Sequence, residues 1–119
     1  MKGHHRLDVW KRSIEFVSAI YRLTADFPDI EKFGLISQMR RSAVSIPSNI
    51  AEGAGRGSKR EFRNFLSYSQ GSIAELETQL IISERLHFIS KDDFVIIHGT
   101  ILEILKMLSS YISYHKIHS

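Results

Sequence analysis

The sequence contains no cysteine. This absence excludes disulfide bridges, thiolate zinc sites and a cysteine nucleophile, and it fits a reducing compartment. No uninterrupted apolar run approaches the roughly 18 residues that a membrane span needs. The first ten residues, MKGHHRLDVW, lack the apolar core of a signal peptide. We therefore predict a cytoplasmic protein that does not associate with a membrane.

Charge is small in total but unevenly distributed. The formal net charge is +3, yet residues 1–63 contain twelve basic and seven acidic residues, whereas residues 64–119 contain four basic and six acidic ones. Residues 40–63 alone hold six basic and two acidic residues. A basic region of this kind indicates an anionic partner, most simply nucleic acid. A solvated surface of mixed charge is the alternative interpretation.

Apolar residues recur at three- and four-residue steps along the whole chain, which is typical of amphipathic helices and not of strands. The 119 residues are enough for one domain and one core. The pattern predicts four helices, at residues 8–26, 33–54, 59–87 and 91–116. Because short connections join them, we predict an all-α, antiparallel up-down-up-down four-helix bundle.

Each predicted helix has an expected buried face. On the first it is Leu7, Trp10, Ile14, Val17, Tyr21 and Thr24, and on the second Leu35, Met39, Ala43, Ile46 and Ile50. On the third it is Phe62, Phe65, Ser69, Ile73, Leu76, Leu80 and Ser83. The fourth has two apolar stripes, one of Phe94, Ile97, Ile101, Ile104, Leu108 and Tyr111, the other of Val95, Leu102, Leu105 and Ile112. Two stripes indicate a helix that is central to the monomer or shared with another subunit.

The second helix contains Pro47, which removes one backbone hydrogen bond. We favour one kinked helix over two helices because the apolar steps stay in phase across the proline. Ser42, Ser45 and Asn49 form a polar stripe on this helix. Hydrogen bonding to carbonyls near the kink or to a neighbouring helix is the favoured role of the stripe, and ligand binding is the alternative.

The third helix begins with a capping box, Ser58 and Glu61, after a turn rich in glycine. Lys59, Arg60 and Arg63 lie in its first turns, where the helix dipole favours acids. These cations are explained if they meet an anion, or the misplaced charge is simply tolerated in water. Gly71, in the middle of the helix, predicts the close approach of another backbone.

No constellation of residues supports catalysis. Glu84 and His87 resemble half of a di-iron site, but the second E-x-x-H and the two further glutamates are missing. The GAGRGSK stretch has the wrong order for a phosphate-binding loop. His115 and His118 are better explained by the end of a helix, and His4 and His5 by a terminal segment. We predict no enzyme activity, no cofactor and no metal site.

Two stretches are specific enough to indicate a family. QMRRSAVSIPSNIAEGAGRGSKREF followed by FLSYSQGSIAELETQL resembles the bacterial four-helix-bundle proteins that are encoded within intervening sequences of 23S rRNA genes. The resemblance extends from LDVW near the start to KMLSSYI near the end. It implies a monomer that assembles into a ring, with pentamers known among relatives. Those relatives include the accessory protein of diversity-generating retroelements, which binds nucleic acid and a reverse transcriptase.

We therefore expect a non-enzymatic, oligomeric and nucleic-acid-binding protein, with a pentamer as the implied ring. The candidate phosphate-contacting residues are Arg40, Arg41, Arg56, Lys59, Arg60 and Arg63. Contacts of this kind depend on salt and carry no base identity. For Arg41, an ion pair with Glu75 of the third helix is an equally supported structural role. The alternative function is a protein-interaction scaffold that recruits a partner, such as a reverse transcriptase or a ribosome-associated factor.

Overall fold

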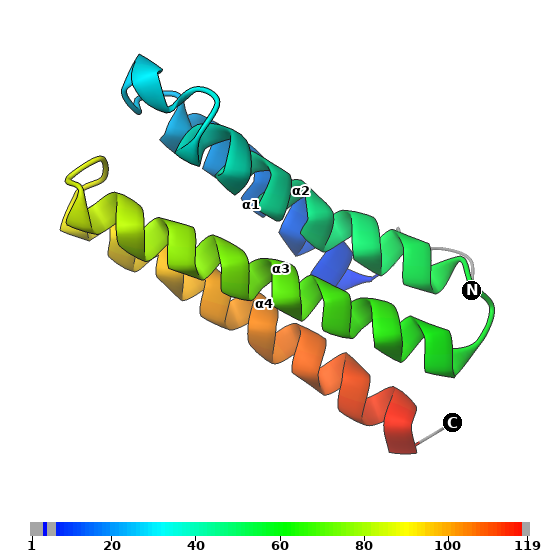
Figure 1. The fold of residues 1–119 in the computed structure, drawn as a ribbon. Coiled ribbons are helices and arrows are strands. Elements are labelled where there is room, and N and C mark those ends of the chain that lie inside the picture. Colours follow the sequence, from blue (N-terminus) through cyan, green and yellow to red (C-terminus); the bar gives the residue numbers. More distant parts are fainter. Residues whose placement is uncertain (1–3, 5–6, 118–119) are drawn as a thin grey trace.

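The computed structural model describes residue 4 and residues 7–117, and the described chain forms four long helices and no strand. The helices are α1 (Asp8–Thr24), α2 (Leu35–Ala54), α3 (Lys59–Arg85) and α4 (Lys91–Ile117), with a short 3₁₀ helix η2 (Asp29–Glu31) between α1 and α2. Successive helices run antiparallel, α1 beside α2 and α3 beside α4 (Figure 1). The predicted all-α, up-down-up-down four-helix bundle is confirmed.

Local backbone geometry sets the helix ends. His87 has a φ of 64°, a left-handed conformation that cannot continue a right-handed helix. The third helix therefore ends at Arg85, two residues before the predicted end. Gly34 also has a non-helical backbone, so the second helix begins at Leu35 instead of Phe33. The predicted cap Ser58 accepts a hydrogen bond from the backbone N–H three residues later, at 3.1 Å, and Ser90 before α4 does the same at 3.1 Å.

The core is a continuous apolar cluster to which all four helices contribute. The predicted buried face of α2 is confirmed, because all five of its residues are buried. On α3 the predicted face is buried except for Phe65, which is half-buried. The first stripe of α4 is likewise buried or half-buried along its length.

The predicted face of α1 is confirmed at Leu7 and Thr24, which are buried, and wrong at Ile14 and Tyr21. Ile14 and Tyr21 are each 42% exposed, and the side chains that enter the core are instead Val9, Phe16 and Ile20. α1 has apolar side chains around more than half of its circumference, so two stripes compete for the core. Packing against the other helices decides between them, and the second stripe is left along the outer side of the α1–α2 pair.

α2 continues through Pro47 as one helix, as predicted. Hydroxyl and amide groups bond to carbonyls in the turn that precedes the proline. Ser45 Oγ donates to the Ser42 carbonyl and Asn49 Nδ2 to the Ser45 carbonyl, each at 2.8 Å. Ser69 of α3 donates to the Ile46 carbonyl at 2.9 Å. Ser45 and Asn49 of the polar stripe are thus bonded within the protein, which is the favoured role predicted for the stripe.

Among the glycines that the structure describes, another helix approaches most closely at Gly53 of α2, and not at Gly71 as predicted. A Cβ at Gly53 would lie 2.6 Å from Phe65 Cβ and 3.2 Å from Phe62 Cδ1. Nothing lies within 4 Å of a Cβ at the exposed Gly71. The position that requires glycine is therefore where the end of α2 packs against the start of α3.

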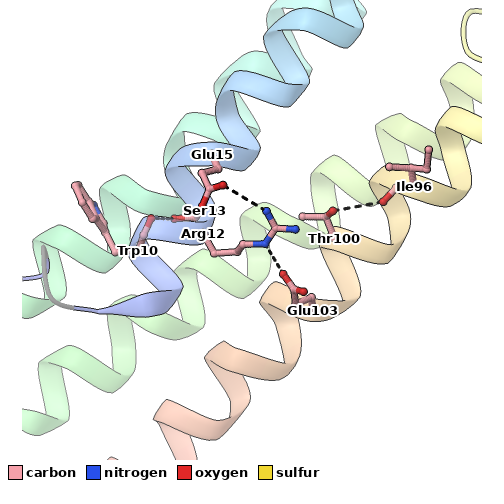
Figure 2. A network of polar contacts seen from close by, with 7 residues as sticks. All are labelled: Trp10, Arg12, Ser13, Glu15, Ile96, Thr100 and Glu103. Carbon is pink, nitrogen blue, oxygen red and sulfur yellow. Dashed lines mark hydrogen bonds and ion pairs between the residues drawn. The ribbon is translucent and has the colours of Figure 1, made fainter.

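α1 and α4 make the least contact of the neighbouring helix pairs, and a polar bridge closes their seam. Arg12 Nε donates to the Glu103 carboxylate of α4, while Glu15 lies 3.9 Å from the same guanidinium (Figure 2). The hydrogen bond that Arg12 donates to Glu103 raises the pKa of Arg12 above its usual value. Because that value is already high, the guanidinium stays charged at every working pH. The bridge is exposed to solvent, where such pairs contribute about 0–1 kcal/mol.

The second apolar stripe of α4 is divided between the core and the surface. Leu105 and Ile112 are half-buried against the core. Val95 is 66% exposed and Leu102 is 51% exposed, so α4 is not central to the monomer. By length and composition α4 could also cross a membrane, with a mean hydropathy of 1.4. This is weak evidence, because a helix that supplies a core stripe such as Ile101, Ile104 and Leu108 passes the same test.

Substitution of Gly53 by alanine is expected to destabilise the bundle. The new methyl group meets Phe65 Cβ, which is fixed close to the backbone, so α2 and α3 must separate at a cost of about 1–3 kcal/mol. Gly71→Ala is the matched control, which should stabilise the protein by about 0.5–1 kcal/mol through helix propensity. Urea denaturation of both variants measures the difference. Equal effects at the two positions would contradict the assigned close contact.

Candidate nucleic-acid interface

The six candidate cations do not form one patch. Arg41 lies thirteen residues before the end of α2 at Ala54, which is roughly 20 Å along the helix axis. We call Arg56, Lys59, Arg60 and Arg63 the turn cluster, because they surround the α2–α3 connection. Lys32, Arg40 and Arg41 lie towards the other end of the bundle, and we call them the groove cluster. The two clusters are therefore separate surfaces.

Two arginines of the turn cluster, Arg56 and Arg63, contact other residues of the bundle. The Arg56 guanidinium lies 3.2 Å from the Glu52 carboxylate and 3.9 Å from that of Glu61, and it also covers the Phe65 ring at 5.1 Å. Arg63 Nη1 donates to the His115 carbonyl at 2.9 Å. This bond ties the start of α3 to the last turn of α4, where a cation is favoured by the helix dipole.

Three members of the turn cluster, Arg56, Lys59 and Arg60, are exposed, and Arg63 is half-buried. Lys59 and Arg60 are the two exposed members on α3. Both lie in the first turn of α3, beyond the Ser58 cap. Among the described residues no carboxylate lies within ion-pair distance of Arg60. Lys59 and Arg60 are thus exposed at the start of α3, while Arg56 and Arg63 make the contacts described above.

The groove cluster lies along a shallow groove between α1 and α2. Arg40 is partly structural, because its Nε donates to Thr24 Oγ1 at 2.9 Å and its guanidinium covers the Tyr21 ring at 4.5 Å. Arg41 is exposed and, within the described chain, forms no ion pair. The predicted Arg41–Glu75 pair is not formed, so that structural role of Arg41 is wrong. Lys32, which sequence reasoning missed, lines the groove beside them.

Two aromatic rings line the same groove and were also missed. Phe33, predicted to open the second helix, lies in the connection before it and is 90% exposed. Tyr21, predicted to be buried, is 42% exposed on the groove side of α1. The signal in the sequence was the Lys32–Phe33–Gly34 run, in which a cation and an aromatic ring precede a break. The spatial neighbourhood with Arg40 and Arg41 requires the fold.

The described residues contain no group of three or more histidines and acids placed to hold a metal ion. His87 lies beyond the end of α3 in a left-handed conformation. It therefore does not share a helical face with Glu84. His98 Nε2 lies 2.7 Å from the Glu77 carboxylate, which joins α4 to α3. His5 and His118 lie outside the described residues. The predictions of no enzyme activity, no cofactor and no metal remain predictions.

Comparison with known proteins decides the family. The model of the 23S rRNA-intervening sequence protein family matches residues 5–110. The chain belongs to this family. A similar solved structure is the crystal structure, at 1.70 Å resolution, of a protein of unknown function from the S23 ribosomal protein family of Bacteroides thetaiotaomicron. It is 29% identical, with a TM-score of 0.78 over 87% of this chain and 97% of that chain.

A search among curated proteins found no match to this chain. Membership of the intervening-sequence family confirms the resemblance drawn from the SIPSNIAEG and GSIAELETQL stretches. In this intervening-sequence protein the first stretch supplies the Pro47 region of α2 and the Gly53 contact. The second stretch supplies Ile73 and Leu76 to the core, and much of the resemblance is therefore explained by packing.

Arg40 and Arg41 are expected to differ in their effect on stability. Arg40→Met removes the hydrogen bonds to Thr24 and to the Tyr21 carbonyl, together with the ring contact. The loss should lower the free energy of unfolding by about 1–2 kcal/mol. Arg41→Met should change it by less than about 0.5 kcal/mol, as expected for an exposed residue. Thermal denaturation compares the pair, and a larger loss for Arg41→Met would reverse the assignment.

Proposed function

We propose that this intervening-sequence protein is a non-enzymatic, ring-forming protein that binds nucleic acid through its phosphates. The observation that carries the proposal is the acid-free lining of the α1–α2 groove, which holds Lys32, Arg40 and Arg41. Cations without carboxylate neighbours attract an anion and release counterions when they bind it. The family name refers to 23S rRNA, which makes RNA the first nucleic acid to test.

The turn cluster contributes Lys59 and Arg60 as further phosphate contacts, while Arg56 and Arg63 support them from within the fold. The nearest acids, Glu52 and Glu61, are both engaged with Arg56. Each surface alone is small, and the net charge of the chain is only +3. Several copies in one ring would act multivalently, so weak sites add up to a useful affinity.

Oligomerisation is supported by the exposed apolar stripe of α4. Val95 and Leu102 are seven residues apart on one face, and Ile96 beside them is 66% exposed. Apolar side chains gathered in this way mark an interaction surface. A second copy of the chain, in the pentameric ring implied by the family, is the proposed occupant. The same stripe also favours the second candidate function, a scaffold that docks a partner protein.

The mass in solution tests the ring directly. Multi-angle light scattering should give an integral multiple of the 13.7 kDa chain, with a pentamer at five times that mass. Leu102→Glu places a charge on the α4 stripe and should reduce the mass towards that of one chain. Ser113→Glu, at another exposed position of α4, is the control and should leave the mass unchanged. A wild-type protein that is monomeric at micromolar concentration would contradict the ring.

Charge reversal tests the nucleic-acid contact. Arg41→Glu and Arg60→Glu should each weaken RNA binding at low salt by about tenfold or more and flatten its dependence on salt, because phosphate contacts are lost. Lys106→Glu changes the net charge by the same amount at an exposed position on α4 and should have a smaller effect. Fluorescence anisotropy at two salt concentrations measures all three. Equal effects from the three variants would indicate only a general effect of net charge. They would contradict specific phosphate contacts at Arg41 and Arg60.

A further inference from the structure

The α1–α2 groove combines cations with aromatic rings. Its volume is about 480 Å³, and it lies near the η2 end of the α1–α2 pair. Tyr21 and Phe33 supply the rings, while Lys32, Arg40 and Arg41 supply the charge. In Figure 1 this end of α2 is opposite to the α2–α3 turn, so the groove is remote from the turn cluster.

Phe33 is unusual because an apolar ring is left 90% exposed at the surface. The ring is not part of the hydrophobic core, and Phe33 lies between η2 and α2. Lys32 Nζ lies 5.6 Å from the centre of its ring, and Arg40 Cζ lies 4.5 Å from the centre of the Tyr21 ring. Each ring is therefore paired with a cation, which places a stacking surface beside a phosphate-binding charge.

The acids of the connection, Asp26, Asp29 and Glu31, do not line the groove. Glu31 precedes Lys32, but its Oε1 accepts a hydrogen bond from the Leu35 backbone N–H at 3.3 Å, at the start of α2. Asp29 is exposed and does not line the groove. The charged residues that line the groove are therefore all cations, so its ligand should be anionic and should carry flat apolar faces.

We propose that this groove selects single-stranded nucleic acid, with Phe33 stacking on an unpaired base and with Lys32 and Arg41 contacting the adjoining phosphates. This inference rests on the proposed function and adds the class of ligand. In a duplex the base faces are already stacked on one another, so only a single strand offers a face to Phe33. Stacking of this kind tolerates any sequence, because every base has a π-face.

The test compares a labelled 20-nucleotide RNA without secondary structure, a duplex of the same length and an abasic oligonucleotide, using fluorescence anisotropy. Wild-type protein should bind the single strand more tightly than either of the others. Phe33→Ala should weaken single-strand binding by about 5-fold or more and leave duplex binding unchanged. Phe33→Trp should retain single-strand binding. Ile30→Ala is the matched control, because Ile30 is 88% exposed in the same connection but does not line the groove.

Equal affinity for single strand and duplex, or equal effects of Phe33→Ala and Ile30→Ala, would overturn this inference while the proposed function stands. No binding of any nucleic acid at low salt would overturn both. A Phe33→Ala variant with an altered light-scattering mass would place Phe33 in a subunit contact and also overturn the inference. So would Phe33-dependent sedimentation with phosphatidylserine vesicles in the absence of single-strand binding.

Discussion

The packing of α2 on α3 is the constraint on which the rest of the bundle depends. At one end Gly53 lets α2 cross Phe62 and Phe65 closely, and in the middle the Ser69 hydroxyl bonds to the Ile46 carbonyl beside Pro47. These contacts fix the position and rotation of α2 against α3. Since α2 carries groove-cluster residues near its start and leads into the turn cluster at its end, its placement decides where both sets of cations lie.

That placement separates charges which are close in the sequence. A helix spaces Arg41 and the α2–α3 turn roughly 20 Å apart, so one basic stretch becomes two surfaces. Arg40, Arg56 and Arg63 then bond to neighbouring helices or to nearby acids. Positive charge in the sequence therefore overstates the charge available to a ligand. The fold also places Lys32 and the rings of Tyr21 and Phe33 in the same groove as Arg41.

The sequence predicted the fold well where one apolar stripe is clearly dominant. α2 shows this best, because its five predicted core residues are all buried. It failed on α1, where Ile14 and Tyr21 belong to a second stripe of similar apolarity and only tertiary packing makes the choice. It failed at Gly71 because a glycine does not reveal which neighbour approaches it. The groove was missed because its lining comes from two helices and an irregular connection, which no helical period links.

Stacking of an unpaired base in the α1–α2 groove is the contact on which the proposed specificity depends. Photo-cross-linking with single-stranded RNA containing 4-thiouridine, followed by mass spectrometry of the peptides, tests this claim most directly. We predict cross-links in the peptides that contain Tyr21 and Phe33, at the residues whose rings line the groove. Cross-links confined to residues 56–63 or to α4 would contradict the account and move the binding surface elsewhere on the bundle.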